Sequence, residues 1–254
     1  MAYRYLFEQM VRRELRQKYR GSALGVLWYL INPLVLMGAY YLMFGVIFNQ
    51  TSEPDYPLFL LIGLVVWVFF NQAVVSAAPS LLDQGALVRK ARFPREIIPA
   101  SVVTVQLVTF LALLALLAPV TIAIRGTVDV ALLLLPLVLA SLFAFVLGVA
   151  FVVSILHAYF RDVAPILSAA LLPWFFVSPI FFRPESITDQ PTYRFILEWV
   201  NPVAPFIGAI RDVVYGGIVP SGPELAYVVV AGALALLCGH ALFRRLQGEL
   251  AVVV

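Results

Sequence analysis

Hydrophobic positions along the chain are gathered into six long runs that polar residues rarely interrupt. A membrane-spanning helix needs about 20 consecutive, mostly apolar residues, and each run is close to that length. The runs are continuous, whereas the strands of a membrane β-barrel alternate apolar and polar residues, so an all-α bundle is predicted. The six predicted spans cover residues 27–48, 58–82, 97–124, 130–156, 165–182 and 225–243.

The fifth predicted span is the shortest, and it carries Pro165, Pro173 and Pro179. A proline inside a helix removes one backbone hydrogen bond and displaces the preceding turn. We therefore expect this span to be bent or broken.

The first predicted element, residues 3–20, does not have the pattern of a span. Phe7, Val11, Leu15 and Tyr19 repeat every four residues and form one apolar stripe, while the arginines lie off it. Such a helix lies in the membrane interface with its basic face at anionic headgroups. Its charge fits a simple topology anchor, and it also fits a gate at the cytoplasmic mouth.

A second polar interruption, residues 81–101, separates two of the most apolar runs. Arg89, Lys90, Arg92 and Arg95 fall within seven positions there. A short helix ended by Pro94 is predicted. Apolar Leu87, Val88 and Phe93 stand between the charges, and a pure topology signal would not need them. This favours a docking surface for a cytoplasmic partner.

The third interruption, residues 183–224, contains two apolar pieces at 193–200 and 204–215. Pieces this short are typical of re-entrant or interfacial helices. The second piece carries Arg211 and Asp212, which would be costly at the bilayer centre. Two short helices on the external side are predicted.

Composition agrees with the membrane prediction and excludes an ordinary soluble domain. The chain is 63% hydrophobic and 12% charged, with a mean hydropathy of +0.98, against roughly 45–50% and 25% in soluble domains. Basic residues gather before the first span, between the second and third, and after the sixth. Because cytoplasmic loops are rich in Lys and Arg, both termini are predicted to be cytoplasmic.

The sequence offers little catalytic chemistry. It has no P-loop, no HExxH and no GxSxG, and its single cysteine, Cys238, cannot form an intramolecular disulfide. His157 and His240 are distant from each other in sequence and make poor metal ligands. The predicted spans carry no acidic residue, which weakens an ion-coupled mechanism. We predict a non-catalytic protein with neither a metal site nor a bound cofactor.

Polar and aromatic residues inside the spans each allow two interpretations. Asn32, Asn71, Gln72 and Gln106 fit hydrogen bonds between helices, and less readily a cavity lining. The aromatic residues of spans two and five fit an interfacial belt. They would also suit a platform for sugar rings, since aromatic faces are rigid and apolar. Composition alone favours packing for the amides and the belt for the rings.

Five motifs follow one another in a familiar order. They are "YRGSALGVLWYLINP" (Tyr19, Ser22, Leu24, Gly25, Trp28, Asn32, Pro33), "FPREIIP" from Phe93, "YFRDV" from Tyr159, "SPIFF" from Ser178 and "NPVAPF" from Asn201. In order and spacing the chain resembles the ABC-2-type permeases that export polysaccharides. The resemblance covers essentially the whole chain.

This resemblance implies a single transmembrane domain over residues 1–254, with an interface helix at 1–22, a cytoplasmic coupling loop at 83–96 and an external gate region at 183–224. It implies a homodimer in a bacterial inner (cytoplasmic) membrane, working with two copies of a separate ATPase subunit that binds ATP and magnesium. The exported substrate would be a polyprenyl-linked glycan, such as an O-antigen, teichoic acid or galactan.

The resemblance also assigns roles to residues. Gly85, Leu87, Val88, Arg89, Lys90 and Arg92 would couple to the ATPase. Arg16, Lys18, Arg20 and Trp28 would meet the lipid anchor at a cytoplasmic gate. Trp67, Phe70, Trp174, Phe175, Phe176 and Phe182 would line the conduit.

Other functions fit parts of the same sequence. An ABC-2-type exporter of a drug, lipid or other small amphiphile would share the topology. A membrane-embedded transferase acting on polyprenyl lipids would need a carboxylate–histidine pair, for which Asp162 and His157 are the only neighbours. An ion-coupled transporter is disfavoured by the absence of acids in the spans.

Overall fold

The computed structural model describes residues 2–19, 27–47, 55–90, 93–186 and 191–250, and every regular element among them is a helix. The elements are α1 (Ala2–Tyr19), α2 (Trp28–Tyr40), α3 (Tyr56–Ala77), α4 (Ser80–Asp83), α5 (Gly85–Lys90), α6 (Ile97–Arg125), α7 (Leu135–Tyr159), α8 (Val163–Val177), α9 (Pro191–Phe195), α10 (Ala204–Arg211) and α11 (Gly222–Leu246). π-Helical turns extend α2 to Ile47, α9 to Val200 and α10 to Gly216, and 3₁₀ turns lie at Val130–Leu134, Pro184–Ser186 and Gln247–Glu249.

In the described part of the chain, four helices are long and apolar enough to cross a membrane. They are Tyr56–Ala77, Ile97–Arg125, Val130–Tyr159 and Gly222–Leu246, and each coincides with a predicted span. The predicted first and fifth spans form shorter apolar helices, Ile31–Ile47 and Val163–Val177.

The fifth predicted span is short because α8 ends at Val177 instead of Phe182. Ser178 leaves the helix with φ −79° and ψ 144°. Proline disfavours helical geometry in the residue before it, so Pro179 accounts for this end. Pro173 lies inside α8 and does not end it. The chain beyond Val177 is irregular up to the turn at Pro184–Ser186.

The core is organised around α3, which packs against α2, α6, α7, α8 and α10. Most of α3 is buried, including Phe59, Trp67 and Phe70. Its apolar residues surround the whole helix, which is the pattern of a central helix rather than of a surface one.

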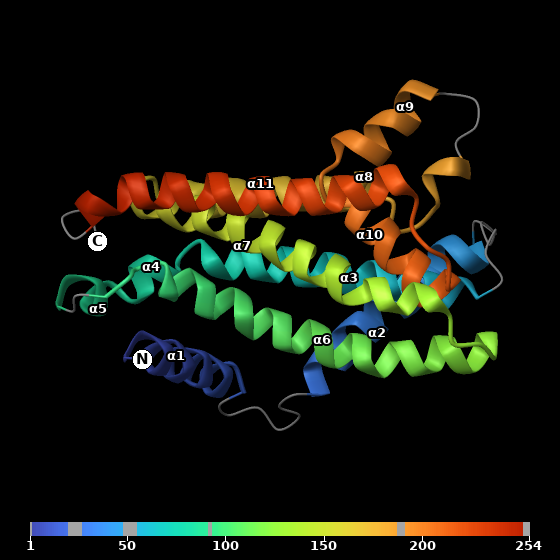
Figure 1. Cartoon of the computed structure of the whole chain (residues 1–254), viewed down its shortest axis with the longest axis horizontal. Coiled ribbons are helices and arrows are strands. Elements are labelled where there is room, and N and C mark those ends of the chain that lie inside the picture. Colours follow the sequence, from blue (N-terminus) through green and yellow to red (C-terminus); the bar gives the residue numbers. More distant parts are fainter. Residues whose placement is uncertain (1, 20–26, 48–54, 91–92, 187–190, 251–254) are drawn as a thin grey trace.

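The closest helix pair is α7 with α11 (Figure 1), and glycines make their approach possible. A Cβ atom at Gly148 would collide with the backbone of Ala235, and one at Gly239 would collide with Gly148. Gly232 faces the backbone of Ser141 in the same way. Small residues allow membrane helices to approach at backbone distance, where dispersion contacts are strongest.

Gly148→Ala is therefore expected to destabilise the bundle, although alanine is the better helix former. The added methyl group must push α7 from α11, and overpacking of this kind costs about 1–3 kcal/mol. Gly38→Ala is the matched control, because nothing lies within 4 Å of a Cβ there. Thermal melting in detergent should show a fall of several degrees for Gly148→Ala and no fall for Gly38→Ala. Equal melting temperatures would contradict the close pairing.

One end of the bundle gathers α1, α4, α5 and the described C-terminal residues, and α9 and α10 lie toward the other (Figure 1). A second, smaller core joins that first end, built from Met10, Leu81, Val88, Ile98, Phe151, Ile155, Ala158, Phe243 and Leu250. The described chain therefore begins and ends at the same end of the bundle.

The helix predicted at the start of the chain is present as α1, but the residues that it packs against the bundle differ from the predicted apolar stripe. Met10 is its most buried described side chain, and Leu6 packs beside it, while Phe7, Val11 and Leu15 are only half-buried. Met10 packs in one cluster with Ile98 of α6, and Lys18 bonds to Gln106 of α6, so the predicted stripe lies beside the face that α1 turns to α6. The Tyr19 side chain lies outside the described residues.

Candidate functional site

A groove of about 400 Å³ runs between α2 and α8, with α3 as its floor. It is lined by Asn32, Leu36 and Tyr40 of α2, by Leu64, Trp67, Val68, Asn71, Gln72 and Val75 of α3, and by Ser168, Leu171, Leu172 and Phe175 of α8. The groove is therefore mixed in character, with amides and a hydroxyl set among rings and aliphatic side chains.

The groove changes the interpretation of three amide residues. Asn32, Asn71 and Gln72 line it, and no hydrogen bond ties any of them to another helix in the described part of the chain. Asn32 is exposed, and Asn71 and Gln72 are half-buried, so the three amides face the open groove and do not serve as packing bonds between helices. These residues fit the cavity-lining alternative, which the sequence made the weaker one.

The predicted conduit aromatics come together beside this groove. Trp67 lies 5.6 Å from Phe70, 6.1 Å from Trp174 and 5.7 Å from Phe175, ring centroid to ring centroid. Phe176 lies 5.1 Å from Phe175 and is 49% exposed. Five of the six predicted rings thus form one cluster, while Phe182 is half-buried against the main core.

Three further rings complete the cluster. Tyr40 lies 5.4 Å from Phe175 and 5.0 Å from Phe181, and Phe44 lies 4.6 Å from Phe181. The prediction omitted Tyr40 and Phe44, although their spacing of four residues places both on one face of the first span.

The predicted coupling loop, residues 83–96, begins at the last residue of α4 and contains the short helix α5, which follows a break at Gln84. Val88 is 2% exposed and packs in the smaller core, Leu87 is half-buried against that core, and Gly85 is buried. Arg89 is exposed, α5 ends at Lys90, and Arg92 lies outside the described residues. The apolar residues therefore anchor α5 to the bundle, and its charged face is the accessible one.

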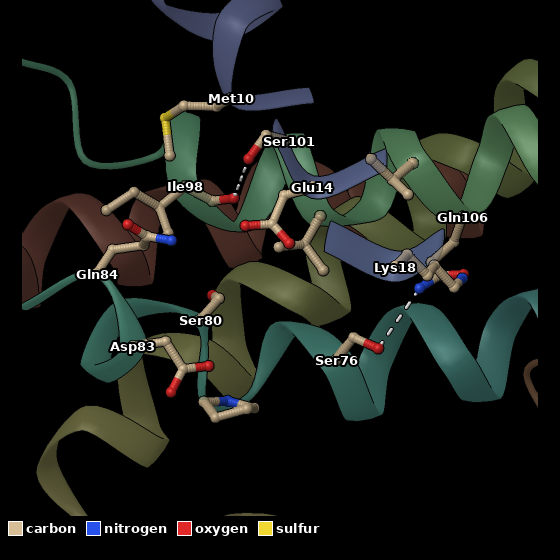
Figure 2. Close-up of a pocket in the computed structure, with 13 residues that line it drawn as sticks. Met10, Glu14, Lys18, Ser76, Ser80, Asp83, Gln84, Ile98, Ser101 and Gln106 are labelled. Carbon is tan, nitrogen blue, oxygen red and sulfur yellow. Dashed lines mark hydrogen bonds between the residues drawn. The ribbon is translucent and has the colours of Figure 1, made fainter. Parts of the chain in front are cut away.

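Of the predicted lipid-anchor residues, Arg16, Lys18 and Trp28 lie in the described part of the chain. Arg16 is exposed on α1, Trp28 is 53% exposed at the start of α2, and Arg20 lies outside the described residues, as do Ser22, Leu24 and Gly25 of the first motif. Lys18 points instead toward α6, at a cavity beneath α1 (Figure 2).

This cavity measures about 420 Å³ and lies between α1, the end of α3, α4 and the start of α6. Its lining is Met10, Glu14, Lys18, Ser76, Pro79, Ser80, Asp83, Gln84, Ile98, Ser101, Val102, Val105 and Gln106. Of these residues, the sequence had assigned a possible binding role only to Lys18 and Gln106. The others lie in four separate segments, and only the packing of α1 on α6 assembles them.

Lys18 joins α1 to this cavity wall. Its Nζ donates to Gln106 Oε1 at 2.6 Å, and Gln106 Nε2 lies 3.5 Å from Ser76 Oγ. Partial burial of the ammonium group lowers the pKa of Lys18 from 10.5 to about 8, because the charged form loses solvation.

Docking of α1 on α6 should consequently tighten as the pH rises from about 8 toward 10.5. Between those values the undocked lysine binds a proton that the docked lysine has released, so deprotonation favours the docked state. Spin labels at Arg12 and Val108 would report the distance between α1 and α6. Its distribution should be narrower at about pH 9.5 than at about pH 7. A Lys18→Met variant should lose this difference, and a pH-independent wild type would contradict the docked geometry.

At the other end of the bundle, Arg211 is buried at 3% exposure. Its guanidinium donates to three backbone carbonyls: Phe59 O at 3.1 Å, Pro179 O at 2.6 Å and Ile180 O at 2.5 Å. It also lies 3.7 Å from the centre of the Phe59 ring. The end of α8 at Val177 creates two of these acceptors, because carbonyls after a helix end lack intrahelical partners.

Gly63 of α3 leaves the space that Arg211 occupies, since a Cβ there would collide with the guanidinium. The neighbouring Asp212 lies 3.5 Å from Arg183. Burial raises the pKa of Asp212, and the Arg183 charge opposes that shift. Together these contacts tie α10 to α3 and to the segment after α8.

The described residues contain no cluster of side chains that resembles a metal site or a catalytic carboxylate–histidine pair. No group of three or more His, Cys, Asp or Glu side chains there could hold a metal ion. His157 is buried and its Nδ1 accepts the backbone N–H of Ala164 at 3.3 Å, while Asp162 is exposed.

Known proteins are similar to this chain over most of its length. The family model described as ABC-2 type transporter matches residues 5–215. The chain is 30% identical to the O-antigen export system permease protein RfbA of Myxococcus xanthus, over 98% of this chain and 95% of that protein. It is 26% identical to the RfbA of Klebsiella pneumoniae (98% and 96% covered) and 27% identical to the polysialic acid transport protein KpsM of Escherichia coli (93% and 92% covered).

Proposed function

The chain belongs to the ABC-2 type transporter family, and on that premise we propose that it is the membrane subunit of an ATP-driven exporter of lipid-linked polysaccharide. The observation that carries this proposal is full-length similarity to permeases named for O-antigen and polysialic acid export. The amide- and ring-lined groove supports it, because a sugar offers both hydroxyls and apolar C–H faces.

The chain itself would be non-catalytic, and energy would come from a separate ATPase subunit. Two copies of the chain and two ATPases would form the working exporter. The groove between α2 and α8 opens to the surface of one copy, so a second copy facing it would close a conduit wide enough for a glycan.

The bundle would lie in a bacterial inner membrane with six crossings per chain. The helices α2 and α8 would supply the first and fifth of them. The end that carries α1, α4 and α5 would face the cytoplasm, because basic residues concentrate there. The helices α9 and α10 would then form the external gate region.

The exposed face of α5 would receive the ATPase. Val88 fixes α5 to the smaller core, so a push on α5 would pass to α6, α7 and α11 through that core. Arg89 stands on the accessible face. Because α5 is fixed to this core, movement of the ATPase would be passed to the membrane helices without being absorbed by α5.

The test is to express the chain with its ATPase subunit, purify the complex and measure ATP hydrolysis. A polyprenyl-linked glycan should stimulate hydrolysis more than small amphiphiles do. The reverse order would favour export of a small amphiphile. The Arg89→Glu variant should lose the ATPase during purification, while Arg244→Glu, which is exposed on α11 at the same end, should keep it.

A further inference from the structure

The cavity beneath α1 has a chemistry that the basic outer face of α1 does not share. On the outer face, Arg12 and Arg16 are exposed, as suits anionic headgroups and phosphates, while Arg13 donates to Gln84 Oε1 at the rim of the cavity at 3.4 Å. Inside the cavity, two carboxylates, Glu14 and Asp83, outnumber the single ammonium of Lys18. Both carboxylates would repel a pyrophosphate inside the cavity, with only Lys18 within it and Arg13 at its rim to offset them, so the cavity suits the charged part of a lipid anchor poorly.

The polar groups inside the cavity suit a ligand rich in hydroxyls. The Ser80 and Ser101 hydroxyls donate to the carbonyls of Ala77 and Ile98 at 2.7 and 2.8 Å, which leaves their oxygen lone pairs as acceptors. Glu14 and Asp83 are further acceptors, and Gln106 offers an amide with both donor and acceptor. Figure 2 shows these side chains on opposite walls of one space.

The volume and the apolar lining of the cavity also suit a ligand of the size of a sugar. The volume of about 420 Å³ falls within the range of roughly 300–1,000 Å³ that is usual for small-molecule sites. Met10, Ile98 and Val102 supply an apolar side against which a ring face could pack. The contact of Gln106 with Ser76 is long, at 3.5 Å, so a ligand hydroxyl could replace it at little cost.

We propose that this cavity binds the sugar unit nearest the lipid anchor through its hydroxyls, while the pyrophosphate stays outside on the arginines of α1. The inference rests on the proposed function and adds a recognition site to it. Lys18 closes the cavity through Gln106, so that α1 serves as its roof.

The test compares binding of two kinds of probe to the chain–ATPase complex in nanodiscs. One is polyprenyl pyrophosphate, and the other is a panel of the same lipid bearing one hexose or one N-acetylhexosamine. At least one sugar-bearing probe should bind about tenfold more tightly than the bare pyrophosphate. Gln106→Leu and Asp83→Asn should reduce this advantage to less than about threefold.

Asp83 is exposed, so its variant should fold normally, and melting temperatures would verify both proteins. Ser141→Ala, in α7 and remote from the cavity, is the matched control and should keep the full advantage. Arg12→Gln should weaken the binding of both kinds of probe by the same factor, since Arg12 would contact only the pyrophosphate that they share. If every probe bound alike while glycan still stimulated ATP hydrolysis, the cavity proposal would be overturned and the proposed function would stand. If glycan also failed to stimulate hydrolysis, both would fall.

Discussion

Replacing Arg211 with methionine is expected to lower the melting temperature of the protein by about 10 °C. The guanidinium is the donor to the carbonyls of Phe59, Pro179 and Ile180. Methionine would fill part of the volume but donate no hydrogen bond, and each unsatisfied buried carbonyl costs about 1–3 kcal/mol. A loss of about 4 kcal/mol is the estimate for three acceptors that relax in part.

The measurement is thermal unfolding of the purified protein in detergent, followed by size-exclusion chromatography. Arg194→Gln is the matched control, because Arg194 is partly exposed and its one partner among the described residues is Glu198, in an i,i+4 pair at 3.2 Å. Such pairs contribute about 0.3–0.5 kcal/mol, so this variant should melt within a degree or two of the wild type. Equal melting of the two variants would mean that Arg211 does not hold α10 to α3.

Ser168→Trp is expected to reduce export at least about tenfold without changing the fold. Ser168 is exposed on α8 and lines the groove, so an indole there would fill much of its roughly 400 Å³. A glycan cannot pass a conduit that a large rigid ring obstructs. Because the position is exposed, the larger side chain displaces no core residue.

The measurement is ATP-driven accumulation of lipid-linked glycan in proteoliposomes. Ala233→Trp is the matched control, since Ala233 is exposed on α11 and does not line the groove. It should export at the wild-type rate, and both variants should melt like the wild type. Wild-type export by Ser168→Trp would exclude the groove from the path of the glycan.

The long helices were predictable because the length of an apolar run alone decides whether a segment can form a membrane-spanning helix. Twenty or more apolar residues in a row predict a helix that can span a membrane, and α6 begins and ends within one residue of its predicted range. The end of α8 was harder to predict, because the segment carries three prolines and only Pro179 ends it. Sequence alone does not say which proline a neighbouring helix will accommodate.

Arg211 illustrates what sequence patterns cannot supply. The sequence marked it as costly in a membrane, yet its acceptors lie about 30 residues away at Pro179 and Ile180, and 152 away at Phe59. The cavity beneath α1 is similar, since its lining comes from segments that only tertiary packing brings together. Val88 is the opposite case: its place between charged residues predicted a partner's surface, and the chain's own core covers it.

The most direct test of the whole account is glycan transport in proteoliposomes that contain the chain alone, the ATPase alone or both. If the chain is a conduit driven by a separate ATPase, lipid-linked glycan will cross only when both proteins and ATP are present. Export by the chain alone, or ATP hydrolysis by the purified chain, would contradict it.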